Sequence, residues 1–325
     1  MTSTDTATAQ PPIKATAVRR PGDTIFQTLS TASGALILAI LAAVFLFLLL
    51  RGAPALFTAV DPASHSDALR GKAGGFWPYV GPLVFGTVWS SLLAMLMAFP
   101  VGIAVALFIS HFTNRKLSGA LGFVVDLLAA VPSVVFGLWG ILVFAPIAGP
   151  FYAWLAKYMN WFPLFSGAPT TTGKNMMTAA IVLGIMILPI ITSLSREIFL
   201  QTPRLHEEAS LALGATRWEM VQQAVFPYAS SGVFAAAILA LGRALGETMA
   251  VTMVLSSKSV VNFQVLTSDN PMTIAASIAK NFPEATGTDT ATLIAGGLVL
   301  FAITLVVNSL GRWIISRGQS SNKKK

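Results

Sequence analysis

Hydrophobic residues run through this 325-residue chain in long stretches separated by short polar segments. An α-helix needs about 18 or more apolar residues to cross a bilayer. Six stretches meet that length, at approximately 30–50, 81–109, 121–146, 176–195, 229–256 and 291–314. The second is long enough to tilt, and Pro100 within it is expected to kink the helix. The pattern therefore predicts an all-α, polytopic membrane protein with six transmembrane helices.

The composition agrees with this prediction and excludes several classes of protein. Of the residues, 54% are hydrophobic and only 10% are charged, whereas soluble domains carry roughly 25% charged residues. Cysteine is absent, so disulfide frameworks, thiolate nucleophiles and zinc sites built on cysteine are excluded.

The distribution of Lys and Arg predicts the orientation of the helices. With the N-terminus in the cytoplasm, thirteen basic residues fall inside and seven outside, leaving Arg243 within a span. Since basic residues concentrate in cytoplasmic loops, we expect both termini in the cytoplasm and the connections 51–80, 147–175 and 257–290 outside. This excess of basic residues on the cytoplasmic side, facing membrane lipid, accounts for the net charge of +8. No nucleic-acid partner is implied.

The rest of the chain divides into one membrane domain with two flanks. Residues 1–29 are predicted to form a disordered cytoplasmic arm with the start of the first span, because they begin with a Thr-, Ala- and Pro-rich segment. Residues 30–314 form the six-helix domain, and 315–325 form a basic cytoplasmic tail. In the last external connection, "MTIAASIAKNF" predicts a short apolar helix that is too short to span and is expected to re-enter the membrane.

One cytoplasmic connection, residues 196–228, is long, charged and helical in pattern. It contains "EEASLALGATRWEMVQQAVFP", in which Ala209, Leu213 and Trp218 predict two short amphipathic helices. Gly214 permits a sharp turn between them. A compact helical hairpin of this kind is suited to the groove of a partner protein.

The same segment carries a family resemblance. The spacing of Glu208-Ala209, Gly214 and Pro227 resembles the EAA loop of ABC importer permeases. In that family the loop docks on an ATP-binding subunit, which implies a coupling role for Glu207, Glu208, Ala209 and Gly214. The segments "LLAAVPSVVFGLWG", "ALGRALGETMAV" and "MTIAASIAKNF" are similar to permeases of the phosphate-specific transport (Pst) family.

The resemblance implies a type I ABC importer permease fold in a bacterial plasma membrane. It also implies a function: import of inorganic phosphate by alternating access, driven by ATP hydrolysis in a separate subunit. The implied partners are a second permease like PstA, an ATPase dimer like PstB and an extracytoplasmic phosphate-binding protein like PstS. The chain itself is then no enzyme and holds no cofactor, since ATP and Mg²⁺ belong to the ATPase.

"ALGRALGETMAV", residues 240–251, places two charges inside the fifth predicted span. Arg243 and Glu247 are four residues apart, so on one helix they face the same side and can pair. A charge at bilayer depth costs at least about 2.5 kcal/mol and is expected to mark function. Gly242, Gly246 and nearby alanines leave room for a second helix. Because Arg presents a fork suited to phosphate oxygens, we expect Arg243 on an anion path with Glu247 holding it; a purely structural ion pair is the alternative.

Other functions remain open at this stage. Molybdate or sulfate is an alternative substrate. A proton-coupled secondary carrier with Asp126 and Glu247 as proton sites is an alternative mechanism, although Asp126 near a span's end is also expected to be solvated. "GAPTTTGKN" departs from P-loop spacing, and no nucleophile–base pair for a hydrolase is evident. His65, His111 and His206 lack metal-ligand spacing and are expected to be solvated, so no metal site is predicted.

Overall fold

The computed structural model describes residues 21–57, 75–256, 258 and 260–322. These residues contain twelve α-helices, five short 3₁₀ or π segments and one isolated β-bridge, between Lys258 and Pro271. The chain divides into two units, residues 1–47 and 48–325, each described by itself. α1 (Pro21–Gly52) makes up the described part of the first unit and continues into the second. The predicted arm's first 20 residues, His65 and the last three lysines lie outside the described residues.

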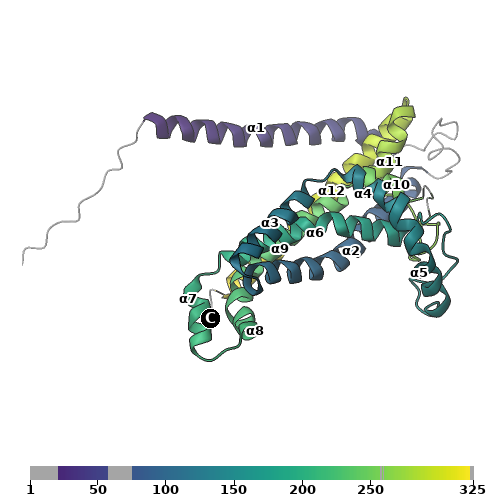
Figure 1. The fold of residues 1–325 in the computed structure, drawn as a ribbon. Coiled ribbons are helices and arrows are strands. Elements are labelled where there is room, and N and C mark those ends of the chain that lie inside the picture. The colour runs from purple at the N-terminus through teal and green to yellow at the C-terminus, as the bar shows by residue number, and fades with distance from the viewer. Residues whose placement is uncertain (1–20, 58–74, 257, 259, 323–325) are drawn as a thin grey trace, which may run out of the picture. The chain divides into compact units, whose positions relative to one another are not determined.

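The remaining helices follow in chain order and are labelled in Figure 1. They are α2 (Phe76–Leu107), α3 (Arg115–Ala129), α4 (Ser133–Trp139), α5 (Ala145–Tyr158), α6 (Met176–Leu200), α7 (Arg204–Ala212), α8 (Arg217–Met220), α9 (Phe226–Leu245), α10 (Met249–Val254), α11 (Ile274–Asn281) and α12 (Thr288–Asn322).

Six helical segments in the described residues are long and apolar enough to cross a membrane, as the hydrophobic pattern predicted. They are Gly22–Leu56, Phe76–Phe112, Ser133–Tyr158, Met176–Leu200, Arg217–Leu245 and Thr288–Arg317. Three of the short segments are π-helical: η2 (Phe108–Phe112), η3 (Gly140–Phe144) and η4 (Val221–Val225). Each continues a neighbouring α-helix, so η4 makes α8 and α9 parts of one span.

α6 lies at the centre of the second unit and packs against α2, α3 and α9. Small residues allow the close approach. A Cβ on Gly102 of α2 would lie 2.8 Å from the Ile191 side chain, and one on Gly184 would lie 3.5 Å from the Ala94 carbonyl oxygen. The core is therefore a contact between helices, built around the most buried span.

The third span differs from its predicted range, 121–146. α3 ends at Ala129, and α4 begins after Pro132, which has extended φ/ψ values of −60° and 139°. Proline lacks an N–H and disfavours a helical residue before it. Pro132 therefore separates two helices, and the span runs over Ser133–Tyr158.

α3 is consequently a separate amphipathic helix. It begins at Asn114, whose side chain accepts a hydrogen bond from the Leu117 amide at 3.0 Å. Asp126 lies within it and accepts a hydrogen bond from Ser193 of α6 at 2.6 Å. Asp126 is exposed, and its solvated position stays a prediction.

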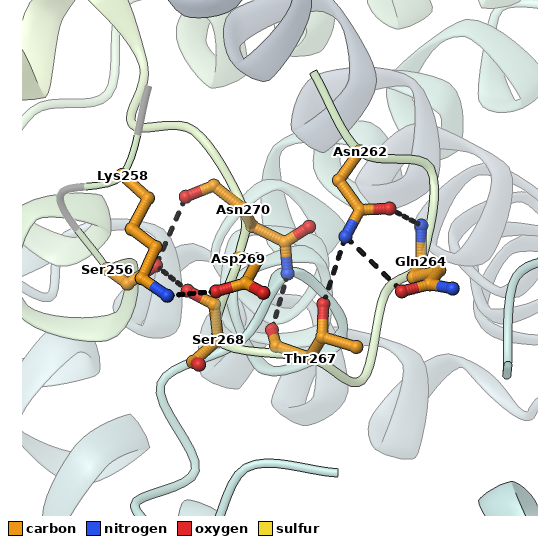
Figure 2. Close-up of polar contacts among 8 residues, drawn as sticks. All are labelled: Ser256, Lys258, Asn262, Gln264, Thr267, Ser268, Asp269 and Asn270. Carbon is orange, nitrogen blue, oxygen red and sulfur yellow. Dashed lines mark hydrogen bonds and ion pairs between the residues drawn. The ribbon is translucent and has the colours of Figure 1, made fainter. Parts of the chain in front are cut away.

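The loop between α10 and α11 is held by its own polar side chains (Figure 2). Lys258 pairs with Asp269, and the Asn270 amide donates to the Thr267 carbonyl at 2.7 Å. The Asn262 amide also donates to Thr267, at 3.2 Å. Asp269 and Asn270 therefore brace this loop.

α11 is the short apolar helix that was expected in this region. Tyr79 of α2 lies 2.9 Å from Ser277 through their hydroxyls, and the Thr87 hydroxyl accepts from the Ile274 amide at 2.9 Å. Ile274, Ala276 and Ser277 are buried, so α11 is enclosed by the protein.

Candidate functional site

Arg243 and Glu247 do not form the predicted pair. α9 ends at Leu245, and α10 begins only at Met249. Gly246 is a poor helix former, and the Thr248 hydroxyl donates to the Gly246 carbonyl at 3.2 Å. Because the helix stops between them, the two charges lose the i, i+4 geometry, and no ion pair joins them within the described chain.

Glu247 instead acts as a cap. Its side chain is 8% exposed, and its Oε1 accepts a hydrogen bond from the Ala250 amide at 3.1 Å. This satisfies an N–H of the first turn of α10 that has no partner within the helix. α10 in turn lies close to α4, since a Cβ on Gly137 would be 2.8 Å from the Ala250 Cα.

Arg243 has a different environment. Its side chain is exposed, and no ion pair or hydrogen bond of Arg243 occurs within the described residues. The buried face of α9 carries Ala236, Ala240 and Ala244, as the small-residue pattern predicted, whereas a Cβ on Gly242 would meet nothing within 4 Å. Arg243 and Gly242 thus lie outside the packed face of α9 and remain accessible.

The predicted hairpin is formed by α7 and α8. Gly214 has φ of +89°, a conformation that glycine adopts without a Cβ penalty. The Ala215 amide donates to the Ser210 carbonyl at 3.2 Å, and the Gly214 amide donates to the Leu211 carbonyl at 3.0 Å. These two bonds form a Schellman motif, so Gly214 ends α7 as expected.

A capping box that we did not predict fixes the second helix. The Thr216 hydroxyl accepts from the Glu219 amide at 3.3 Å, and Glu219 Oε2 accepts from the Thr216 amide at 2.7 Å. The sequence signal was present, since Thr-x-x-Glu is the usual form of this motif.

The hairpin presents apolar side chains outward. Leu205 is 76% exposed, Leu213 90% and Trp218 52%. Ala209 and Glu208 are also exposed. Apolar groups in this number on a compact projection mark a surface for a partner.

Glu207 and His111 connect the hairpin to the end of α2. His111 Nε2 lies 3.4 Å from Glu207 Oε1, and the His111 side chain is only 8% exposed. The expectation that His111 is solvated was therefore wrong, because η2 and α7 enclose it. His206 is exposed, as expected. The contact between His111 and Glu207 spans 96 residues of sequence, and no local pattern indicated it.

These features define a membrane transport subunit with an ABC importer permease fold. The same fold occurs in an inward-facing MetNI methionine ABC transporter, with a TM-score of 0.53 and 17% identity over 74% of this chain and 96% of that chain. It also occurs in a bacterial ABC transporter involved in the import of alginate, with a TM-score of 0.52 and 17% identity over 76% of this chain and 86% of that chain.

Comparison of sequences gives the family. The chain belongs to the binding-protein-dependent transport system inner membrane components, whose model matches residues 98–318, and to their PstC group. The phosphate transport system permease protein PstC 2 of Mycobacterium tuberculosis is 41% identical over 91% of this chain and 92% of that protein. PstC of Mesorhizobium japonicum is 35% identical over 91% of this chain and 90% of that protein. The chain is therefore a transport subunit and not an enzyme.

Proposed function

We propose that this chain is one of two permease subunits of an ATP-driven importer of inorganic phosphate. The observation that carries the proposal is the 41% identity, over nine-tenths of both chains, to a protein named as a phosphate transport permease. Phosphate would cross by alternating access, in which one ligand path opens first to the outside and then to the cytoplasm.

The position of Arg243 supports a path shared with a second permease. A cation that lay on a path inside this chain alone would be enclosed by it, but Arg243 is exposed on the unpacked side of α9. A second subunit like PstA, placed against this side, would enclose Arg243 and leave a guanidinium for the anion to approach. Glu247 would act from the following turn, as a cap that sets where α10 begins.

The hairpin supports docking of an ATPase dimer like PstB. Glu207, Glu208, Ala209 and Gly214 all lie in or directly after α7, and the exposed leucines beside them offer apolar contact area. ATP and Mg²⁺ would bind to that dimer, and this chain would need no cofactor. A phosphate-binding protein like PstS would then dock on the opposite face.

The orientation belongs to the same proposal. In the second unit, the α7–α8 hairpin lies at one end and the α10 and α11 region at the other (Figure 1). Placing the hairpin in the cytoplasm, where ATP is present, puts the connections 147–175 and 257–290 outside, in agreement with the charge distribution.

The test is uptake of radiolabelled phosphate by the complete transporter in liposomes that contain ATP on the hairpin side. We expect uptake that requires ATP and is unaffected by excess sulfate or molybdate. Competition by either oxyanion at equal concentration would assign the alternative substrate. Uptake driven by a proton gradient without ATP would instead support a secondary carrier.

A further inference from the structure

A second basic site lies away from Arg243, between the start of α3 and the hairpin. A cavity of about 440 Å³ is lined by residues within 110–119, from η2 into the start of α3, and within 196–207, from the end of α6 into α7. The cavity therefore connects two elements of the second unit with the helix that carries the proposed coupling residues.

The charge of this cavity is strongly positive. Arg115, Arg196 and Arg204 line it, and Glu207 is the acidic residue of the lining. The Glu207 carboxylate is already engaged by His111 at 3.4 Å. Three arginines thus line the cavity with one carboxylate, so the lining carries a net positive charge. Arginine forks are the preferred protein ligands of phosphate groups.

Two buried polar atoms at the cavity have no partner within the described chain. Thr202 is 4% exposed, and its Oγ1 makes no hydrogen bond. The Nε of Arg196 is likewise buried without an acceptor. Buried polar groups are nearly always hydrogen-bonded, so these two residues of the lining leave a hydroxyl and an N–H without an acceptor.

The guanidinium of Arg196 is held in place by α3. A Cβ on Gly122 would lie 2.8 Å from Arg196 Cζ and 2.9 Å from Nη1, so the guanidinium packs directly on the glycine backbone. Its Nη1 also donates to Glu197 at 3.2 Å, but that carboxylate is 60% exposed. An exposed pair of this kind contributes little and leaves the other guanidinium N–H groups available.

We propose that this cavity binds a phosphate group, supplied by inorganic phosphate or by the headgroup of an anionic phospholipid. The arginines would supply charge, and the hydroxyl of Thr202 would complete the coordination as a hydrogen-bond donor. A bound anion would join α3 to the α6–α7 connection and so restrain the hairpin. The site is separate from Arg243, and the proposal does not depend on which anion the transporter carries.

The chain contains no cysteine, so one introduced thiol reports on the cavity directly. Ser118 lines the cavity and is partly buried. The probe is the alkylation rate of Ser118→Cys in the complete transporter, held in nanodiscs of neutral phosphatidylcholine in phosphate-free buffer. We expect added inorganic phosphate to slow alkylation at constant ionic strength, while the exposed control Ser316→Cys keeps its rate.

A second arm distinguishes the source of the phosphate group. Nanodiscs that contain phosphatidylglycerol replace the neutral ones, without added inorganic phosphate. Protection only in these nanodiscs assigns a lipid headgroup, and protection by inorganic phosphate in neutral nanodiscs assigns the free anion. Equal protection by sodium chloride, or none in either arm, would overturn the proposal. The proposal would also be overturned if the docked ATPase already shielded the Ser118→Cys thiol from alkylation, because the cavity would then be part of that interface.

Three variants in the Ser118→Cys background test the named contacts. Arg196→Gln should raise the half-protecting concentration about tenfold or more, and Thr202→Val about threefold, as expected for loss of one charged and one neutral hydrogen bond. Gly122→Ala retains every charge and displaces only the flexible end of Arg196, yet it should also weaken protection.

Two controls complete the design. Arg312→Gln removes an exposed arginine that does not line the cavity and should change nothing. Arg243→Gln should leave protection intact, which separates this site from the proposed transport path. Unchanged protection in all three cavity variants would show that the thiol reports something other than a bound phosphate group.

Discussion

At the scale of single residues, two charges that are four positions apart have different roles. Glu247 is buried and bonded to the backbone of α10, whereas Arg243 is exposed and makes no ion pair in the described chain. Removing either charge therefore leaves no buried, unpaired charge behind, and single substitutions are informative.

Arg243→Gln should reduce phosphate uptake at limiting phosphate at least about tenfold, because a charge-assisted hydrogen bond is worth about 1.5–3 kcal/mol. The amount of this chain in the membrane should stay unchanged, since Arg243 makes no hydrogen bond or ion pair within the described residues. The measurement is radiolabelled uptake normalised to the complex present in the membrane, with Arg312→Gln as control. Normal uptake by the Arg243 variant would leave Arg243 without a role in the anion path.

Comparison of Glu247→Gln with Glu247→Ala distinguishes the capping hydrogen bond of Glu247 from its negative charge. Gln keeps an oxygen that accepts from the Ala250 amide, so the thermal stability of the purified complex should be retained. Ala removes that acceptor and should cost about 1 kcal/mol, seen as a lower melting temperature. Equal melting temperatures for the two variants would contradict the capping role.

At the scale of elements, the turn of the hairpin depends on one backbone conformation. Gly214 has φ of +89°, and a Cβ there would meet nothing within 4 Å. The constraint is therefore conformational and does not come from crowding.

Gly214→Val should abolish transport while the protein stays in the membrane, because a β-branched residue at positive φ is strained by about 1–2 kcal/mol or more. Gly214→Asn is the matched control, since Asn tolerates this conformation, and it should retain most of the uptake. The readouts are uptake and co-purification of the ATPase. Val and Asn variants that behaved alike would show that the turn conformation is unimportant.

A second glycine is required by packing. A Cβ on Gly86 of α2 would lie 2.4 Å from the Met272 carbonyl oxygen, which belongs to the backbone just before α11. Gly86→Ala should therefore destabilise the protein by about 1–3 kcal/mol. Gly119→Ala in α3, where nothing lies within 4 Å, should be neutral or gain up to about 1 kcal/mol. Thermal unfolding of the two purified variants decides between them; a Gly86 variant as stable as the Gly119 variant would contradict the packing argument.

At the scale of the whole molecule, the six spans and the hairpin make the topology testable. Thr171 and Ser268 are exposed in the connections before α6 and before α11. Single cysteines there should react with an impermeant thiol reagent in intact cells, and one at Ser118 should react only after the membrane is opened. Labelling of Ser118→Cys in intact cells, or protection of the other two, would reverse or break the proposed orientation.

The sequence by itself determined the features that depend on local pattern. Long apolar runs indicated six spans because backbone groups in lipid must be bonded within a helix. The position of Gly214 and the spacing around Glu208 indicated the hairpin, because a helix end of this type needs a residue that adopts positive φ. The apolar stretch around Ile274 is too short to span a membrane, and this length indicated the short helix there.

Only the tertiary structure decided where a long apolar stretch divides into two helices, and which groups lie beside each charged side chain. Pro132 and Gly246 lie in long, largely apolar stretches whose composition favoured one continuous helix, whereas α3 ends at Ala129 and α9 ends at Leu245. Glu247 became a cap, His111 became buried against Glu207, and Arg115, Arg196 and Arg204 gathered around one cavity. Each of these outcomes depends on residues that are far apart in sequence or on competition between side chain and backbone, which the periodicity of a single helix does not contain.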